Sequence, residues 1–239
     1  IISGVEVAKK IFKEEAAAAD FEKPISDGSV IKPGDVAYYV TCPTRALLMA
    51  ERLVLNTMQR MSGIATIASL YLQEIEGLPV KILDTRKTTP GMRFLEKQAV
   101  VHGGCHNYRA GLYDWIMIKD NHVEACGDIA LAIDRVHEYL QKTQKDLSIT
   151  IEVRNLVELQ KVLDHGGVTR IMMDNFEIPI LKEAVAMVNK RFETEASGGI
   201  DLHNVRAYAE TGVDYVSSGA LTHSAGTMDM RLKIIFSEG

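Results

Sequence analysis

The sequence has 239 residues, of which 46% are hydrophobic and 25% are charged, and its formal net charge at pH 7 is -5. This composition is typical of a globular chain long enough for one large domain or slightly more. No apolar run approaches the roughly 20 residues that a membrane-spanning helix needs. We expect neither a membrane nor a nucleic acid as a partner.

The cysteines and the first residues bear on the compartment. Cys42, Cys105 and Cys126 are odd in number and far apart, with no CxxC pair and no histidine at zinc spacing. This pattern favours neither a disulfide framework nor a structural metal, and it fits a reducing cytoplasm. The chain begins IISGVEVAKK, without an initiator methionine or the basic-then-apolar order of a signal peptide. We expect that upstream residues are missing.

The first third of the chain predicts a small mixed domain. Apolar residues near 3.6 spacing indicate a helix over Val5–Ala19, and turn signals within Phe21–Cys42 indicate strands of a small sheet. Pro43 then opens a helix whose apolar positions form one face and leave Arg52 off that face. After Ser62-Gly63 we expect a separate helix, because glycine favours a break there.

Beyond Gly77, short apolar strands alternate with helical stretches, which is the signature of a parallel β/α array. A last strand, Asp229–Phe236, is expected to return to the first domain. The strands predicted for the array are Lys81–Asp84, Ile116–Lys119, Ser148–Val153, Arg170–Asp174, Phe192–Ala196 and Tyr215–Ser217.

Polar residues stand at or just after the end of each predicted strand. In a β/α barrel the carboxyl ends of the strands face one mouth, where active sites lie, so the sequence predicts a polar site at that mouth. In chain order these residues are Arg86-Lys87, Lys119-Asp120, Glu152, Asp174-Asn175, Glu195 with Ser197-Gly198-Gly199, and Ser217-Ser218-Gly219.

The stretch Lys81–His122 is also rich in cations, with seven lysines and arginines. Four of them, Arg86, Lys87, Arg109 and Lys119, follow an apolar run or sit beside glycines, so their side chains can converge on a pocket. A solvated basic face would contain the same residue types. The placement favours an anionic ligand.

The glycine pairs and the carboxylates at this mouth each allow two interpretations. Ser197-Gly198-Gly199 and Ser218-Gly219-Ala220 are either plain turns or phosphate loops, since late barrel loops commonly build a phosphate site. Glu152 and Asp174 are either surface carboxylates or groups that face a cationic transition state or a hydrated Mg²⁺.

One lysine and two histidines near this mouth also allow more than one interpretation. Lys119 follows the apolar run WIMI and could form a Schiff base, because a partly buried ammonium group can lose its proton. His122 and His223 could each serve a structural role or contact a ligand.

These residues lie within longer motifs that together resemble one family, the quinolinate phosphoribosyltransferases, also called nicotinate-nucleotide pyrophosphorylases (carboxylating). The motif DTRKTTPG at residues 84–91, followed by IKDNH at residues 118–122, is far more specific than any single glycine motif. The motifs are AERLVLN and MSGIAT at 50–66, ILDTRKTTPGMR at 82–93, NYRAGLYD at 107–114, IKDNH at 118–122, IEV at 151–153, IMMDNF at 171–176, EASGGI at 195–200 and VSSGALTHS at 216–224.

The resemblance implies a fold and an assembly. The fold is α/β: an N-terminal α/β sandwich domain, an open (β/α) barrel of about six or seven parallel strands, and a C-terminal strand that completes the sandwich. We place these parts at residues 1–66, 67–223 and 224–239. The resemblance also implies a homodimer whose subunits complete each other's sites, with Arg52 shared across the interface.

The implied reaction joins quinolinate to 5-phosphoribosyl 1-pyrophosphate and gives nicotinate mononucleotide, pyrophosphate and CO2 in de novo NAD biosynthesis, with Mg²⁺ as the cofactor. The resemblance assigns catalytic roles to Lys87, Glu152, Asp174 and Lys119, with Glu152 and Asp174 also facing the metal. It assigns quinolinate binding to Arg52, Arg86, Arg109, Lys119 and Tyr108. It assigns 5-phosphoribosyl 1-pyrophosphate binding to Lys87, Glu152, Asp174, Ser197, Gly198, Gly199, Ser218, Gly219 and His223.

One residue departs from the family's pattern. Where the family usually has NHR, this chain has Asn107-Tyr108-Arg109, so a neutral phenol replaces a side chain that could add positive charge. Tyr108 can still donate a hydrogen bond. Two rival functions remain open: a Schiff-base aldolase that uses Lys119, and a catalytically silent anion-binding relative.

Overall fold

The computed structural model describes residues 1–235, and its contacts divide the chain into two compact units. The first unit comprises Ile1–Leu70, Thr88–Cys105 and the chain from Leu221 onward. The second unit comprises Tyr71–Lys87 and His106–Ala220. No helix among residues 1–235 is long and apolar enough to cross a membrane.

The first unit begins with helix α1 (Val5–Glu15), followed by two short antiparallel strands, β1 (Asp20–Glu22) and β2 (Tyr39–Thr41). Helix α1 is four residues shorter than predicted, since Ala16 is extended and only its N–H continues the pattern, to Phe12 O. The predicted small sheet is confirmed. The unit also contains α3 (Arg93–His102) and most of the short α9 (Ala220–His223).

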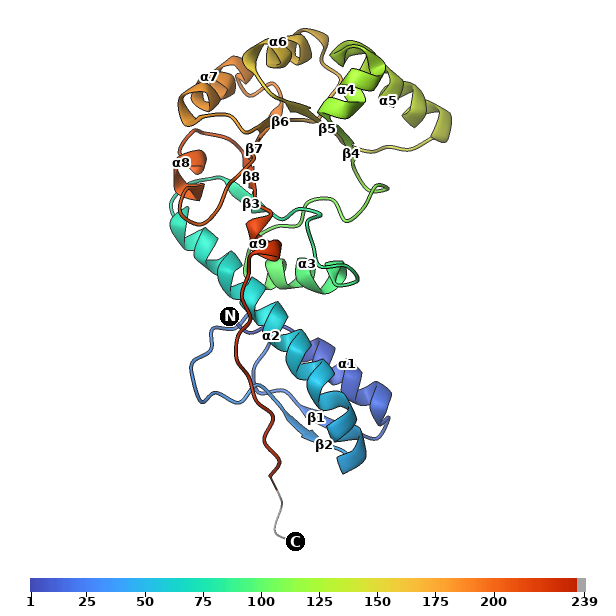
Figure 1. Ribbon diagram of the computed structural model, residues 1–239, viewed down its shortest axis with the longest axis vertical. Helices are drawn as coiled ribbons and strands as arrows, with labels where there is room; N and C mark the ends of the chain where they lie inside the picture. Colours follow the sequence, from blue (N-terminus) through green and yellow to red (C-terminus); the bar gives the residue numbers. More distant parts are fainter. Residues whose placement is uncertain (236–239) are drawn as a thin grey trace. The chain divides into compact units, whose positions relative to one another are not determined.

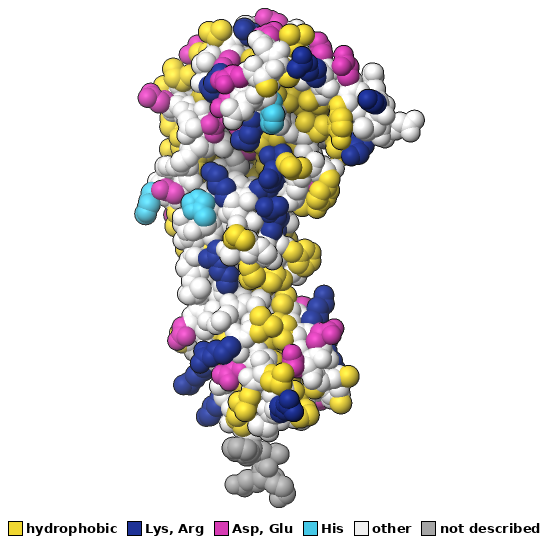
Figure 2. Space-filling model, turned by 45° about the vertical axis from the view of Figure 1, so that its right-hand side comes forward, with side chains coloured by type: hydrophobic (Ala, Val, Ile, Leu, Met, Phe, Trp, Pro, Cys, Tyr) yellow, Lys and Arg dark blue, Asp and Glu magenta, His cyan; other side chains and the backbone are white. Residues whose placement is uncertain are grey.

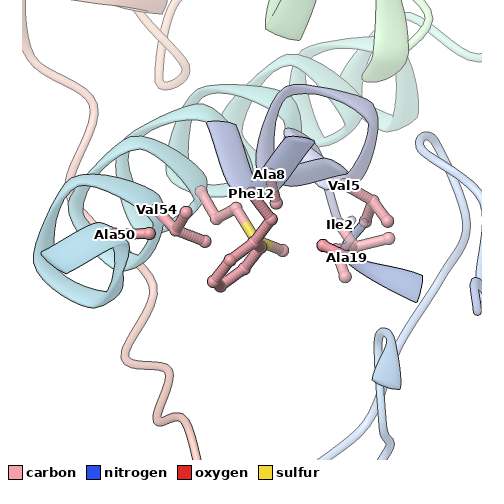
Figure 3. Close-up of a cluster of buried hydrophobic side chains, with 8 residues drawn as sticks. Ile2, Val5, Ala8, Phe12, Ala19, Ala50 and Val54 are labelled. Carbon is pink, nitrogen blue, oxygen red and sulfur yellow. The ribbon is translucent and has the colours of Figure 1, made fainter. Parts of the chain in front are cut away.

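A compact apolar cluster holds this unit together, with residues of α1 and of the following long helix facing one another (Figure 3). The Phe12 ring lies 6.4 Å from Phe21 and 6.1 Å from Tyr38, centroid to centroid, so the helix packs directly on the small sheet. The fully buried cluster consists of Ile2, Val5, Ala8, Phe12, Ala19, Ala50, Val54 and Met58.

The predicted break at Ser62-Gly63 is wrong: a single helix, α2, runs from Thr44 to Glu74. Gly63 serves a close approach between chain segments instead. A Cβ atom at this position would lie 1.9 Å from the backbone oxygen of Gly226. The glycine therefore opens a path for the C-terminal segment across the helix, which no local signal reveals.

The predicted strand Asp229–Phe236 is also not found: residues 229–235 form no strand, and Phe236 lies outside the described residues. The Met228 N–H donates to Gln59 O at 3.0 Å, and Gln59 Nε2 donates to the Met230 carbonyl at 3.0 Å. Met230 also packs against the apolar cluster. The segment thus returns to the first unit as predicted, but it bonds to a helix rather than to a sheet edge.

The second unit is built on a curved parallel sheet, and its predicted strands are confirmed to within one residue at each end. Within the described residues the order across the sheet is β3-β8-β7-β6-β5-β4. The strands are β3 (Lys81–Leu83), β4 (Ile116–Ile118), β5 (Ile149–Val153), β6 (Arg170–Asp174), β7 (Glu193–Ser197) and β8 (Tyr215–Ser217).

A single residue occupies the place beyond β3. His106 forms a parallel bridge with Leu83: its N–H donates to Ile82 O at 2.9 Å, and its carbonyl accepts from Asp84 N at 3.1 Å. One bridged residue is too short to appear as a strand in a hydrophobic pattern. The sheet is therefore an open barrel, with its gap between His106 and β4.

Helices cover the outer face of this sheet (Figure 1). The strand residues that point outward are apolar and buried, as in Ile151 and Ile171. Because strand side chains alternate, Thr150, Glu152, Arg170 and Asp174 point to the opposite, inner face. The covering helices are α4 (Asp120–Cys126), α5 (Ile129–Thr143), α6 (Leu156–His165), α7 (Ile178–Val188) and α8 (Val205–Ala209).

The close approach at Gly63 leads to a stability prediction. Glycine to alanine in an exposed helix normally gains about 1 kcal/mol. Gly63→Ala should instead lower the free energy of unfolding by about 1 to 3 kcal/mol, because the methyl group overlaps the Gly226 backbone. Urea unfolding measures the change, with Asn56→Ala on the exposed face of α2 as the control that should not destabilise. A gain at Gly63 would show that the crossing is loose.

Candidate active site

The polar strand ends predicted from the sequence gather at one edge of the second unit's sheet. Asp174 ends β6 and is the register partner of Ser197, which ends β7. The Ser218 N–H donates to Leu83 O at 3.0 Å, which joins the end of β8 to the end of β3, just before Arg86. This edge, from Arg86 round to Lys119, is the mouth of the open barrel.

Lys119 and Glu152 form an ion pair at this mouth, with 2.7 Å between Nζ and Oε2. Glu152 is held on the inner face of β5 with only 9% of its side chain exposed, whereas the lysine side chain is 45% exposed. The lysine nitrogen is already bound by a carboxylate, so this arrangement does not favour a Schiff-base lysine. The two residues are instead placed to bind charged parts of a ligand.

Arg86 and Arg109 lie close enough to feel each other's charge. Burial lowers the pKa of Arg109, and the positive charge of Arg86 lowers it further. Two neighbouring positive groups of this kind form a site that an anion would stabilise. Figure 2 shows several Lys and Arg side chains close together near the middle of the view, with others spread over the rest of the surface. The cationic cluster predicted from the sequence is therefore present at Arg86 and Arg109.

The loop that carries Arg109 is fixed by carboxylates. Asp84 is fully buried, and its Oδ1 accepts from Tyr108 N at 2.7 Å. Asp114 accepts from the backbone N–H of Ala110 at 2.7 Å and of Gly111 at 3.0 Å. Asp84 belongs to the motif ILDTRKTTPGMR, but no local pattern indicates that it anchors this loop.

Tyr108 points into the barrel rather than presenting its hydroxyl to the mouth. The hydroxyl donates to Thr150 Oγ1 at 2.6 Å, and burial raises the pKa of the phenol, which therefore stays neutral. A direct contact with quinolinate stays a prediction.

The loop after β7 is shaped by glycine. Gly198 has φ +101°, and a Cβ atom there would lie 2.2 Å from Asn175 Oδ1. Gly199 has φ +60° with nothing within 4 Å of its Cβ position, and its carbonyl accepts from Asn204 Nδ2 at 3.0 Å. The loop is thus drawn tightly against the end of β6 and has open space at Gly199, and a phosphate contact there stays a prediction.

Ser218 acts as an internal brace between the two late loops. Its side chain is buried, its hydroxyl donates to Ile200 O at 2.6 Å, and Tyr71 Oη lies 3.0 Å from the same oxygen. With its N–H also bonded to Leu83, this serine ties the β7 and β8 loops together. A phosphate contact by Ser218 stays a prediction, as does one by the neighbouring Gly219.

The remaining predicted ligands are exposed. Lys87 is exposed directly after Arg86, and its N–H donates to Thr85 Oγ1 at 3.1 Å. Arg52 and His223 belong to the first unit. Arg52 is exposed on α2, and His223 is exposed at the end of α9 with its Nδ1 2.7 Å from Ser224 Oγ.

Sequence reasoning missed a charged cluster inside the barrel. Arg170 opens β6, and its buried guanidinium bonds to Glu193 and Glu195. Burial raises the pKa of Glu195, although the charge of Arg170 acts to lower it. An arginine at the first position of an otherwise apolar strand was the available signal.

The carboxylates at the mouth fit a hydrated cation better than a protein-built metal centre. Among residues 1–235, no three or more His, Cys, Asp or Glu side chains are grouped so that they could hold a metal. Glu152 and Asp174 lie on neighbouring strands at one edge, and Asp174 Oδ2 accepts from Asn175 Nδ2 at 2.7 Å. Mg²⁺ commonly uses one or two carboxylates with waters and substrate phosphates, which this pair allows.

Comparison with known proteins identifies the family. Residues 1–62 match the quinolinate phosphoribosyl transferase N-terminal domain, and residues 64–233 match the C-terminal domain of the same family. The chain belongs to the quinolinate phosphoribosyltransferase family. Its parallel strands, polar mouth and small N-terminal unit are therefore the features of this family's α/β fold.

Relatives within the family are similar over nearly the whole chain. Quinolinate phosphoribosyltransferase [decarboxylating] 1 of Nicotiana glauca is 42% identical over 98% of this chain and 70% of its own length. The probable nicotinate-nucleotide pyrophosphorylase [carboxylating] of Bacillus subtilis is 38% identical, over 99% of this chain and 81% of its own.

Solved structures of the family agree with the fold. The nicotinate-nucleotide pyrophosphorylase of Ehrlichia chaffeensis has a TM-score of 0.90 at 37% identity, covering 97% of this chain and 82% of that chain. NadC from Streptococcus pyogenes has a TM-score of 0.89 at 35% identity, covering 96% and 80%.

The two loop glycines allow a matched test of the predicted phosphate loop. Gly198→Ala would force Asn175 away and should weaken binding of ribose 5-phosphate about tenfold or more, since charge-assisted hydrogen bonds would be lost. Gly199→Ala also strains a positive φ, at a cost of roughly 1 to 2 kcal/mol, but meets open space. Calorimetric titration should show its affinity within about threefold of the parent. Equal weakening by both would contradict the role of the Gly198 contact.

Proposed function

We infer that this chain is a decarboxylating quinolinate phosphoribosyltransferase, a glycosyltransferase of NAD biosynthesis. It transfers the phosphoribosyl group of 5-phosphoribosyl 1-pyrophosphate to quinolinate and releases nicotinate mononucleotide, pyrophosphate and CO2. The observation that carries this conclusion is family membership across both domains, with relatives of that name covered over most of their length. The geometry of the mouth supports a role for each group.

Quinolinate is a dicarboxylate, and the mouth carries several cations that a carboxylate can bind. We assign its carboxylates to Arg86, Arg109 and Lys119, where guanidinium groups can bind in a two-point fork. The coupling between Arg86 and Arg109 supports this assignment. Positive charge held in place before binding lowers the cost of orienting the ring nitrogen towards the sugar.

The sugar carries developing positive charge in the transition state, because its bond to pyrophosphate lengthens before the new bond to nitrogen forms. Glu152 and Asp174 are the carboxylates at the mouth that can stabilise this charge and bind the ribose hydroxyls. The exposed Lys87 is placed to meet the departing pyrophosphate. Mg²⁺, which would be held by Glu152, Asp174 and the pyrophosphate, supplies further charge neutralisation.

Decarboxylation then needs no covalent nucleophile. Once the ring nitrogen is bonded to the sugar, its positive charge stabilises the electron pair that the C2–carboxylate bond leaves behind as CO2 departs. A proton from water replaces the carboxylate at C2. The 5′-phosphate is assigned to Ser197, Gly198 and Gly199 with Ser218 and Gly219, and His223 remains a proposed contact. Positioning and charge complementarity are sufficient for both steps.

The test is release of CO2 from quinolinate labelled at the 2-carboxylate, dependent on 5-phosphoribosyl 1-pyrophosphate and Mg²⁺. Nicotinate in place of quinolinate should be a poor substrate, because the missing carboxylate removes a charge-assisted contact with one of the cations at the mouth, each worth about 1.5 to 3 kcal/mol. Equal turnover of nicotinate would reject the assignment of the cations. No release of CO2 would favour the silent relative, and trapping of Lys119 by borohydride with a carbonyl substrate would favour the aldolase.

We further propose that the active form is a homodimer in which Arg52 acts in the partner's site. Arg52 is exposed on α2 among large apolar side chains that are also exposed: Leu48 and Leu53 at 58% and Met49 at 59%. Three such residues on one helix support the proposal that a partner covers this surface. A two-fold axis would make the contact reciprocal, so each subunit would give one Arg52 and receive one.

Complementation tests this sharing. Arg52→Ala and Lys119→Ala should each be nearly inactive alone. When equal amounts are unfolded and reassembled together, half of the dimers are mixed, and each mixed dimer has one intact site and one site that lacks both residues. About a quarter of the parent activity should therefore return. A mixture that stays inactive despite verified subunit exchange would place Arg52 in its own chain's site or in none.

For the compartment we propose the cytoplasm, supported by the free thiols of Cys42, Cys105 and Cys126. Relatives in Nicotiana tabacum and Arabidopsis thaliana are named mitochondrial and chloroplastic, so the compartment differs within the family.

A further inference from the structure

The charged cluster inside the barrel is the strongest feature that the reaction leaves without a role. The Arg170 side chain is only 6% exposed. Its Nη2 lies 2.8 Å from Glu193 Oε2, and its Nη1 lies 3.1 Å from Glu195 Oε2. An ion pair this deeply buried contributes little to stability compared with apolar packing of the same volume. Its position therefore suggests a purpose beyond filling the barrel.

Three aromatic rings surround the Arg170 guanidinium. Its carbon lies 3.7 Å from the ring centre of Tyr215 and 5.2 Å from those of Tyr108 and Trp115. Tyr108 and Trp115 also meet edge to face, with 5.7 Å between centroids. Away from water, each contact between a cation and a ring is worth more than at a surface. Arg170 thus holds two rings that come from one loop.

That loop, residues 107–115, carries Arg109 and contains neither helix nor strand. Side chains must therefore position it. Tyr108 Oη donates to Thr150 Oγ1 at 2.6 Å, and Trp115 Nε1 donates to the same oxygen at 2.8 Å. With Arg170 against both rings, the two ends of the loop that flank Arg109 are fastened to the inner face of β5 and β6.

Arg109 requires such a fastening. Burial lowers the pKa of Arg109 and the positive charge of Arg86 lowers it further, so the two guanidinium groups repel each other. Arg109 Nη2 is also 3.3 Å from Met117 Sδ, a weak acceptor that offers little restraint. A cavity of about 280 Å³ adjoins the loop and is lined by both Arg109 and Arg170, so there is room for the loop to collapse if it is released.

We propose that Arg170 is a positioning residue for substrate binding: through Tyr108 and Trp115 it fixes Arg109 where a carboxylate of the pyridine substrate is bound. Arg170 touches no substrate in this role. The proposal rests on the proposed function, because it gives Arg109 a carboxylate to bind. It predicts an effect confined to one substrate, since Arg170, Glu193 and Tyr215 open their strands, whereas the groups assigned to the phosphoribosyl group stand at or after the far ends of those strands.

The main variant is Arg170→Lys, which keeps the charge but loses the planar fork and the stacking surface. The KM for quinolinate should rise about tenfold or more, while kcat and the KM for 5-phosphoribosyl 1-pyrophosphate stay within about threefold. Arg206→Lys is the matched control on α8, where Arg206 pairs with Glu210 at the surface. It should leave all three constants unchanged.

A second readout does not depend on activity. Trp115 is the single tryptophan of the sequence, so its fluorescence reports on this loop alone. In Arg170→Lys the emission should shift to the red and acrylamide should quench it more, and saturating quinolinate should reverse both changes. In the parent and in Arg206→Lys the ring should stay protected.

The double variant Arg170→Met with Glu195→Gln removes both members of the pair, so that neither charge is left buried alone. It should reproduce the rise in the KM for quinolinate and the exposed Trp115, and it replaces Arg170→Lys as the test if that variant does not fold.

An unchanged KM for quinolinate in a folded variant would overturn the proposal. So would an equal rise in both KM values with a fall in kcat, which would indicate a general structural role. Absence of CO2 release by the parent protein would instead reject the proposed function, and Trp115 would still test the contact.

Discussion

Charge buried inside the barrel is the constraint on which the site depends. Barrels of this kind usually fill their interior with branched apolar side chains. Here Arg170 and Glu195 are buried on the inner face beside the partly exposed Glu193, and the two buried charges need partners because an unpaired buried charge is costly. Those partners come from different strands and from the loop of Arg109. The contacts that pair these charges therefore also hold the loop that carries Arg109.

Buried carboxylates rather than the cations themselves shape the basic stretch. Asp84 is fully buried and anchors the Tyr108 N–H in the second unit. In the first unit Glu96 is fully buried and accepts from Arg60, from the Thr89 N–H and from the Thr89 hydroxyl. Each acid holds a loop that hydrophobic packing could not hold. The lysines and arginines of this stretch predict an anionic ligand, but the buried carboxylates position the loops that carry them.

The strands were predictable because each is a short apolar run bounded by turn residues, and their shared direction placed Glu152 and Asp174 at one edge. The role of Gly63 was not predictable, since it allows close contact with Gly226, and a contact with so distant a residue has no local sequence signal. His106 was missed because one bridged residue has no period. Arg170 was missed for a related reason: its partners Tyr108 and Trp115 lie more than fifty residues away. Sequence periodicity predicts which residues of an element are buried, but contacts between residues far apart in the chain are found only in the structure.

Tyr108 shows how a change of residue type can move a side chain from one task to another. The family's usual histidine could add positive charge beside the carboxylates, whereas the phenol is neutral because burial raises its pKa. Its ring lies on Arg170 and its hydroxyl reaches Thr150, so the side chain faces the barrel interior. The tyrosine adds no positive charge to the mouth. It does attach the loop more firmly, because Tyr108 connects Arg109 to the buried ion pairs. Affinity for a dicarboxylate then depends on how firmly the remaining cations are held, and less on how many there are.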